Sequence, residues 1–274
     1  MYAQYRFETS DKLERNLIVA VLSGFDFNGF EEEDTFIHAY VDAELLNEAE
    51  VKQILSDYNL ETIPYEYSEL PDINWNKEWE SGFQPVTIGD VYIRGTFHEP
   101  QPDKTEIVID PKMSFGTGHH PTTALMIANM KKLDLAGKDV LDFGSGTGIL
   151  SVYAAKLGAK KVDAIDHEEW AFNNCLENAT LNGVEKNINP ILADDSFAFS
   201  QTYPVMLANI NRPVILNNLV KWHELLEPNG TLLLSGLLES DENDILQKSK
   251  THFKHNYTQQ SNGWILISLT KQKL

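Results

Sequence analysis

The stretch Val140–Leu150, VLDFGSGTGIL, decides the fold class because it joins a short apolar strand to a helix through a glycine turn. Glycine accepts positive φ angles and lets a ligand approach the backbone, since no Cβ stands in the way. The helix predicted over 149–157 also begins with free backbone N–H groups. A turn of this kind, at the carboxyl end of a strand, is where an open α/β sheet binds a nucleotide.

The spacing of the glycines indicates which nucleotide. Gly144, Gly146 and Gly148 give G-x-G-x-G, whereas a dinucleotide-binding turn has G-x-G-x-x-G. The next predicted strand, 161–166, ends on Asp166, whose carboxylate can accept hydrogen bonds from both hydroxyls of a ribose. The combination favours an adenosine ligand, and S-adenosylmethionine over NAD. The alternative is an ordinary tight turn with a solvated aspartate.

Composition limits the class of protein. With 274 residues, of which 42% are hydrophobic, the chain can form a large domain and a small one. It contains no apolar run of membrane-spanning length, and its first residues lack the order of a signal peptide. The chain has a single cysteine, Cys175, so it has no cysteine metal cluster. His119 and His120 are neighbours in the chain and point in different directions, so they do not form a metal site. We therefore expect a soluble cytoplasmic protein, with no membrane contact and no bound metal.

Charge is unevenly distributed along the chain. The 22 basic and 41 acidic residues give a net charge of −19, and a field of that sign repels the phosphates of nucleic acids. Residues 1–70 hold 4 basic and 16 acidic residues, a net charge of −12. Such a surface either serves solubility alone or docks a basic partner, in which case salt would weaken the docking.

Residues 1–70 are predicted to form a domain of their own. Their pattern gives the order β-α-β-β-α-β, which is a ferredoxin-like α+β fold. Ser10 and Asp11 can cap the first helix, whose apolar face we expect to contain Leu13, Leu17, Ile18 and Val21, and Asp42 can cap the second. Residues 71–106 are predicted to be a linker, and residues 107–274 the large domain.

In residues 107–274 strands alternate with helices and end in a hairpin, which indicates a Rossmann-like doubly wound α/β sheet with a mixed edge. Four successive strands end near Gly144, Asp166, Asp194 and Asn209, and ligands bind outside such strand ends. Asn209 is predicted to lie nearest to a transferred group. Its amide offers both a donor and an acceptor, so it could hold the amino acid end of a cofactor or orient an incoming amine. The alternative for Asn209 is a turn-forming role.

These motifs carry a family resemblance. The glycine turn followed by Asp166 resembles the first two motifs of class I S-adenosylmethionine-dependent methyltransferases. The segments 110–124, DPKMSFGTGHHPTTA, and 208–210, ANI, are more specific and are similar to the ribosomal protein L-eleven methyltransferase (PrmA) family. A tryptophan-containing stretch, 75–79, and the small N-terminal domain resemble that family as well, so that the resemblance covers nearly the whole chain.

The resemblance implies a definite activity. Members of this family methylate lysine side-chain and N-terminal amines of a basic large-subunit ribosomal protein, which the N-terminal domain recognises. Matched residue by residue, the resemblance implies cofactor contacts at Thr123, Gly144, Gly146, Asp166 and Asn209, with Asn209 also acting in catalysis. A monomer is the default expectation. One departure is Asn211–Pro213, where the family has smaller and more apolar residues, so the shape of the amine channel stays open.

Three other functions remain compatible with the sequence alone. The protein could be a methyltransferase for another protein or a small amine, although a separate acidic domain favours a macromolecular substrate. It could be an NAD-dependent dehydrogenase, against which the glycine spacing argues. It could also be an adenosine-binding adaptor that docks a basic partner without chemistry, which a turnover assay would separate from an enzyme.

Overall fold

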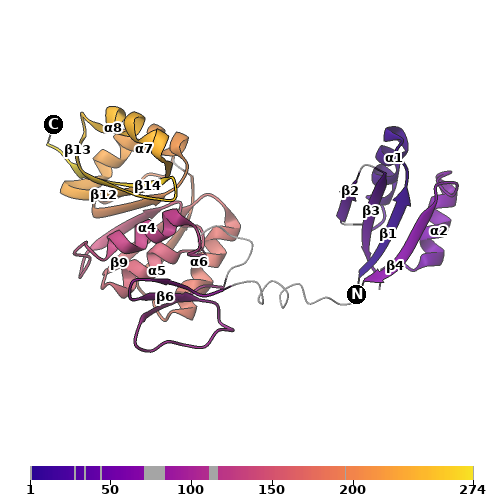
Figure 1. Cartoon of the computed structure of the whole chain (residues 1–274), viewed down its shortest axis with the longest axis horizontal. Helices are drawn as coiled ribbons and strands as arrows, with labels where there is room; N and C mark the ends of the chain where they lie inside the picture. Colours follow the sequence, from indigo (N-terminus) through magenta and orange to yellow (C-terminus); the bar gives the residue numbers. More distant parts are fainter. Residues whose placement is uncertain are drawn as a thin grey trace. The chain divides into compact units, whose positions relative to one another are not determined.

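The structure is a computed structural model that describes residues 2–27, 29–33, 35–43, 45–70, 84–110, 117–194 and 196–273. The chain forms two compact units, Met1–Gly82 and Phe83–Leu274 (Figure 1). The stretch 75–79 and residues 111–116 of the segment 110–124 lie outside the described residues, so the predictions made for them are not addressed by the structure.

The N-terminal unit is an antiparallel sheet covered on one face by two helices. Its elements are β1 (Tyr2–Glu8), α1 (Lys12–Leu22), β2 (Gly29–Glu32), β3 (Phe36–Asp42), α2 (Glu48–Asp57) and β4 (Tyr65–Leu70). The strand order β2-β3-β1-β4 confirms the predicted β-α-β-β-α-β ferredoxin-like arrangement. Alternate residues of β1 and β3, such as Tyr5 and Ala39, share one hydrophobic core with both helices.

Two details of this unit differ from the sequence prediction. Of the predicted face of α1, Ile18 and Val21 are buried together with Leu22, but Leu13 and Leu17 are 79% and 47% exposed. Asp42 belongs to the end of β3, and α2 is capped by Asn47. The Asn47 side chain accepts from the N–H groups of the first turn, and Glu50 bonds back to its backbone, so a complete capping box outcompetes the aspartate.

The larger unit is built on a seven-stranded mixed sheet. Its strands are β8 (Asp139–Phe143), β9 (Lys161–Asp166), β10 (Ile188–Leu192), β11 (Tyr203–Asn209), β12 (Leu226–Leu238), β13 (Phe253–Ser261) and β14 (Trp264–Lys271). The order is β10-β9-β8-β11-β12-β14-β13; the first five strands are parallel, and β14 and β13 are antiparallel additions. The predicted mixed edge is therefore confirmed.

Helices cover both faces of this sheet (Figure 1). One hydrophobic cluster joins the sheet to α4 (Pro121–Met130), α5 (Ile149–Lys156) and α6 (Glu169–Leu181). A second cluster, on the opposite face, joins it to α7 (Arg212–Leu225) and α8 (Glu242–Ser249), which follows the short helix η1 (Glu239–Asp241). Two covered faces on a mostly parallel sheet confirm the predicted Rossmann-like doubly wound fold.

A small sheet precedes this domain in the chain. It consists of β5 (Val86–Ile88), β6 (Val91–Arg94) and β7 (Thr105–Val108), in that order. Val91, Ile93 and Ile107 lie in the same hydrophobic cluster as α4 and α5. The described part of the segment predicted as a linker, residues 84–106, therefore packs on the larger unit.

The strand order reverses between β8 and β11, because the chain first builds outward through β9 and β10 and then returns to the other side of β8. Gly144 follows β8 and Asn209 is the last residue of β11, at the same edge of the sheet. This is the position where doubly wound sheets bind ligands. Among the residues that the structure describes, no helix is both long and apolar enough to cross a bilayer.

Candidate cofactor and active site

The glycine turn after β8 has the backbone geometry that its sequence predicts. Gly144, Gly146 and Gly148 all have positive φ angles, of 75°, 52° and 76°. A Cβ on Gly144 would lie 2.3 Å from Cγ2 of Ile210, and one on Gly148 would lie 2.6 Å from Sγ of Cys175. Glycine is thus required both by the backbone conformation and by the space available.

The turn is anchored on the neighbouring strand β9. The N–H groups of Gly144 and Ser145 donate to the carbonyl of Ile165, at 2.8 and 3.0 Å. The N–H of Gly146 donates to Oδ2 of Asp166 at 2.9 Å, and the N–H of Glu168 donates to Oδ1 at 3.1 Å. A carboxylate offers about four lone-pair sites, so Asp166 can still accept bonds from a diol.

Asn209 and Thr123 meet on the other side of the strand reversal. Thr123 is fully buried in the first turn of α4, and its Oγ1 lies 3.5 Å from Nδ2 of Asn209. Oδ1 of Asn209 is buried and has no hydrogen-bond partner among the residues that the structure describes. Because buried polar atoms in folded proteins are nearly always paired, this oxygen indicates a donor that a ligand would supply.

A cavity of about 230 Å³ opens at this edge of the sheet. Its lining residues are Phe143, Gly144, Ile165, Asp166, His167, Ala193, Asp194 and Val214, from the ends of β8, β9 and β10 and from α7. The apolar members suit a flat heterocyclic base, while Asp166 and Asp194 offer hydrogen-bond acceptors. Bonds from the Ser196 hydroxyl and backbone hold the pKa of the Asp194 carboxyl below its usual range.

Asp142 is buried under the glycine turn. Its Oδ2 accepts a bond of 2.6 Å from the Ser151 hydroxyl, while Oδ1 is buried without a partner. Burial raises the pKa of this carboxyl to about 7, the Ser151 bond opposes the rise, and the charge of Asp166 adds to it. The carboxyl groups of Asp142 and Asp166 therefore both lie at the glycine turn, and Oδ1 of Asp142 is an unfilled acceptor among the described residues.

The predicted site residues fall into two groups in the structure. In the first group, Gly146 donates a hydrogen bond to Asp166, and Gly144 and Asp166 line the same cavity. In the second group, Thr123 contacts Asn209. Ile210, adjacent to Asn209, packs closely against Gly144 and connects the groups.

The sequence assigned no role to the apolar lining of the cavity. Phe143, Ile165, Ala193 and Val214 form that lining. Their places at the ends of predicted strands, or just inside a helix, are the signal that could have found them.

The basic residue of the Asn211–Pro213 departure pairs with two carboxylates. Arg212 pairs with Asp244 of α8, and its Nε lies 3.5 Å from Oδ1 of Asp241 in η1. The Asn211 side chain caps α7 by accepting from the N–H of Val214 at 3.1 Å. Asn211 therefore caps α7, and Arg212 links the first residue of α7 to η1 and α8.

These features fit S-adenosylmethionine. The cavity accommodates an adenine, Asp166 can accept from ribose hydroxyls, and the buried oxygen of Asn209 can accept from an ammonium group. A Rossmann-like sheet with a G-x-G-x-G turn and a following aspartate defines a class I methyltransferase.

Comparisons with known proteins give the family. Residues 11–272 match the family model described as ribosomal protein L11 methyltransferase (PrmA). The chain is 38% identical over 253 residues to the ribosomal protein L11 methyltransferase of Porphyromonas gingivalis, covering 88% of this chain and 87% of the relative. It is 36% identical over 278 residues to that of Bacteroides fragilis, covering 97% and 98%.

A solved structure agrees with these relatives. The crystal structure of a ribosomal protein L11 methylase from Lactobacillus delbrueckii subsp. bulgaricus superimposes with a TM-score of 0.65 at 25% identity, covering 70% of this chain and all of that one. The chain belongs to the ribosomal protein L11 methyltransferase (PrmA) family. The resemblance seen in its motifs is thereby confirmed.

Proposed function

We propose that the protein transfers methyl groups from S-adenosyl-L-methionine to ribosomal protein L11, and that lysine side-chain and N-terminal amines are the acceptors. The match of residues 11–272 to the family model carries this proposal, because it spans the small N-terminal unit as well as the methyltransferase domain. The ribosomal protein L11 methyltransferase of Bacteroides fragilis is matched over 97% of this chain, so both units of the protein have counterparts in that relative.

The cofactor-binding roles follow from the site. When bound, S-adenosylmethionine supplies an activated methyl group on its sulfonium. We assign Asp166 to the ribose hydroxyls and the backbone of Gly144 and Gly146 to the close approach along the turn. Asn209 and Thr123, which contact each other, are assigned to the amino acid end of the cofactor and to the reacting amine of the substrate.

Methyl transfer from a sulfonium is an in-line displacement, so the protein chiefly aligns two reactants. Alignment alone can supply roughly 7–11 kcal/mol of the rate enhancement. This reaction needs no covalent nucleophile, which agrees with a site built from an asparagine, a threonine and glycines. The buried Oδ1 of Asn209 would accept a hydrogen bond from the attacking amine and direct its lone pair toward the methyl group.

The accepting amine has to be neutral. A lysine of ordinary pKa is about 0.1% neutral near pH 7.4, which corresponds to about 4 kcal/mol. Burial beside a sulfonium disfavours the ammonium form and reduces this cost. The protein therefore does not require a strong general base, and a neutral amide such as that of Asn209 suffices to hold the amine.

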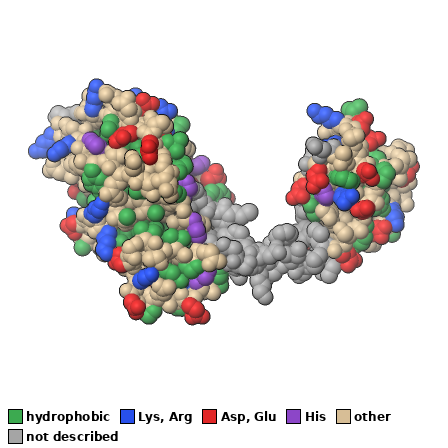
Figure 2. Space-filling model, viewed as in Figure 1, with side chains coloured by type: hydrophobic (Ala, Val, Ile, Leu, Met, Phe, Trp, Pro, Cys, Tyr) green, Lys and Arg blue, Asp and Glu red, His purple; other side chains and the backbone are tan. Residues whose placement is uncertain are grey.

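The N-terminal unit is proposed to dock the protein substrate through its acidic surface. Acidic side chains are spread over its visible face (Figure 2), and the basic residues Arg6 and Lys52 are engaged with carboxylates. Arg6 pairs with Glu66 at 3.5 Å, and Lys52 pairs with Glu48 at 2.7 Å. The remaining negative charge complements a basic ribosomal protein.

Salt dependence tests the docking proposal. Raising salt from about 50 to 200 mM should raise the KM for L11 several-fold, while the dissociation constant of S-adenosylmethionine stays nearly constant, since screening acts on exposed charges. Steady-state kinetics and calorimetry would measure the two. An equal dependence of both quantities on salt would remove the docking role.

We further propose that the protein acts in the cytoplasm as a monomer and does not bind nucleic acid directly. The net charge of −19 supports the last point, because it repels phosphate.

Peptide mapping by mass spectrometry, after incubation with unmethylated L11, tests the proposed acceptors. Methyl groups on lysines or on the N-terminal amine are expected. Methylation restricted to carboxylate or amide side chains would contradict the proposal.

A further inference from the structure

Helix α6 carries an asparagine ladder, Asn174, Asn178 and Asn182, which lies along the backbone of residues 108–110. The N–H and carbonyl of Val108 bond to Oδ1 and Nδ2 of Asn182, at 2.9 and 2.6 Å. The N–H of Asp110 donates to Oδ1 of Asn178 at 2.9 Å, and the carbonyl of Asp110 accepts from Nδ2 of Asn174 at 3.2 Å.

Side-chain amides here take the place of a neighbouring strand. Residues four apart on a helix rise about 6 Å, and residues two apart on a strand rise about 6.7 Å, so the two repeats stay in step. On the opposite side, the N–H of Ile109 bonds to the carbonyl of Arg94 at 2.9 Å, as in a sheet. The ladder thus closes the edge of the small sheet with a helix.

Asn178 makes one bond that sets it apart within the ladder. Its Nδ2 donates to the carbonyl of Thr147 at 2.8 Å, in the middle of the glycine turn. Asn178 is fully buried, so its single amide joins the Asp110 backbone to the turn without competition from water. Asn182 instead directs its amide hydrogens to the carbonyls of Val108 and Asn178.

The glycine turn is flexible enough that the bond from Asn178 to Thr147 can restrict its conformation. Three glycines with positive φ give its backbone wide conformational freedom. Its first part is held by the Ile165 carbonyl and by Asp166, through Gly144, Ser145 and Gly146. Thr147 follows these contacts, and the Asn178 amide holds its peptide from the α6 side.

We propose that Asn178 is a positioning residue for cofactor binding: it fixes the Thr147 peptide, and so the orientation of the Gly146 backbone toward Asp166 and the cofactor. The inference rests on the proposed cofactor site at the glycine turn. Loss of the amide leaves the buried Thr147 carbonyl without this partner, and the bound conformation of the turn must then be selected from more alternatives. Affinity for S-adenosylmethionine falls, while turnover at saturating cofactor is largely retained.

The test compares Asn178→Ala with Asn182→Ala, which removes ladder bonds of the same kind away from the turn. Both variants should lower Tm. Asn178→Ala should weaken S-adenosylmethionine binding about tenfold, with a raised KM for the cofactor and a kcat close to wild type, and Asn182→Ala should leave both constants unchanged. Calorimetry with S-adenosylmethionine and initial rates with L11 give these values.

Two further variants make the outcome decisive. Asn178→Asp keeps an acceptor for the Asp110 N–H and the shape of the side chain but loses the amide donor to Thr147, so it should also weaken binding and decides the matter if the alanine variant does not fold. Asp166→Ala reports on the site itself, and wild-type affinity there would reject the proposed cofactor site.

The remaining outcomes bear on Asn178 alone. If Asp166→Ala loses binding while both Asn178 variants bind as wild type, the positioning role is overturned. It is overturned equally if Asn182→Ala weakens cofactor binding as much as Asn178→Ala, since the effect would then come from a general loosening of α6.

Discussion

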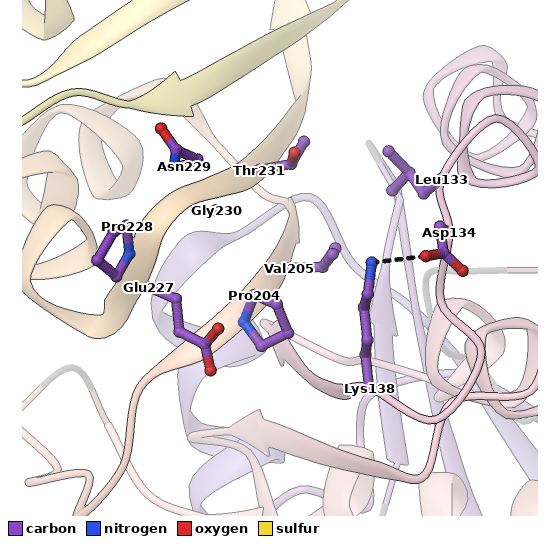
Figure 3. A pocket seen from close by; sticks show the side chains of 10 residues that line it. All are labelled: Leu133, Asp134, Lys138, Pro204, Val205, Glu227, Pro228, Asn229, Gly230 and Thr231. Carbon is purple, nitrogen blue, oxygen red and sulfur yellow. Dashed lines mark hydrogen bonds and ion pairs between the residues drawn. The ribbon is translucent and has the colours of Figure 1, made fainter.

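The two edges of the seven-stranded sheet each carry a cavity, and the two cavities differ in how their polar side chains are hydrogen-bonded. The carboxyl-edge cavity, lined by Gly144 and Asp166 among others, has a volume of about 230 Å³. The amino-edge cavity has about 150 Å³ and is lined by residues that include Asp134, Lys138, Glu227 and Asn229 (Figure 3). Both are open and partly polar, so shape alone would not say which one binds a ligand.

The two edges differ in whether buried polar side-chain atoms near the cavity have hydrogen-bond partners. At the amino edge, Nζ of Lys138 pairs with Asp134 at 3.0 Å, and none of the ten lining residues has a buried side-chain nitrogen or oxygen without a partner, although Oδ1 of the adjacent Asp139 is such an atom. Near the carboxyl edge, oxygens of Asp142 and Asn209 are buried and unpaired. Unpaired buried oxygens beside glycines at positive φ therefore support the ligand site proposed at the carboxyl edge.

The largest expected effect is at Asp166. Asp166→Ala removes the acceptors proposed for the ribose and the carboxylate that holds the Gly146 N–H, so the affinity for S-adenosylmethionine should fall about 100-fold or more. Calorimetry measures it. The matched change at the amino edge, Asp134→Ala, should leave affinity unchanged, and a loss there as large as at Asp166 would break the comparison between the edges.

Asn209→Ala should lower kcat by about 10- to 100-fold at saturating cofactor and L11, because the proposed amine holder is lost while the adenosine cavity is intact. Asn229→Gly is the matched control. Asn229 lines the amino-edge cavity at a positive φ of 63°, which glycine adopts without strain, so turnover should be unchanged. Full turnover of Asn209→Ala would end its catalytic assignment.

Asp142 predicts a pH effect on stability. Its pKa is raised to about 7 in the folded protein, from an ordinary value of 3.8, so between these values the folded chain holds a proton that the unfolded chain has released. This group therefore favours folding at low pH and loses that contribution as pH rises toward 7. Asn cannot ionise, so Asp142→Asn should gain stability relative to wild type by about 3 kcal/mol between pH 5 and 8.

Urea unfolding of both proteins at pH 5 and pH 8 measures this difference. A difference in unfolding free energy between variant and wild type that does not grow with pH would show that Asp142 is ionised throughout and that burial has not raised its pKa.

The smallest effect is expected at Lys138. It forms an exposed i,i+4 pair with Asp134, and such pairs contribute about 0.3–0.5 kcal/mol. Lys138→Ala should change the unfolding free energy by no more than that and leave cofactor affinity and turnover as in wild type. A clear loss of cofactor affinity would give the amino-edge cavity a role in cofactor binding and would contradict the comparison between the two edges.

Local signals made much of the fold predictable. The glycine turn, the strand ending on Asp166 and the alternating pattern after it identify a doubly wound sheet, because each depends on residues adjacent in the chain. The first helix shows where such reasoning fails. Leu13 and Leu17 are as apolar as the predicted Ile18 and Val21, and only packing on the sheet decides that Ile18 and Val21 are buried while the two leucines stay exposed.

The candidate site shows the same division. Gly144, Gly146 and Asp166 could be placed together from spacing alone, and their mutual hydrogen bond agrees with it. The Asn178 anchor could not be predicted, because asparagines four residues apart look like the polar face of any helix. Their partners are backbone groups far away in the sequence, and no side-chain pattern reveals them.

The measurement that tests the central claim most directly is intact-protein mass spectrometry of unmethylated L11 incubated with S-adenosylmethionine and this protein, beside its Asp166→Ala variant. The account predicts a ladder of methyl-sized mass additions on L11 with wild type, and few or none with the variant at limiting cofactor. No addition with wild type, or an equal ladder with both proteins, would contradict it.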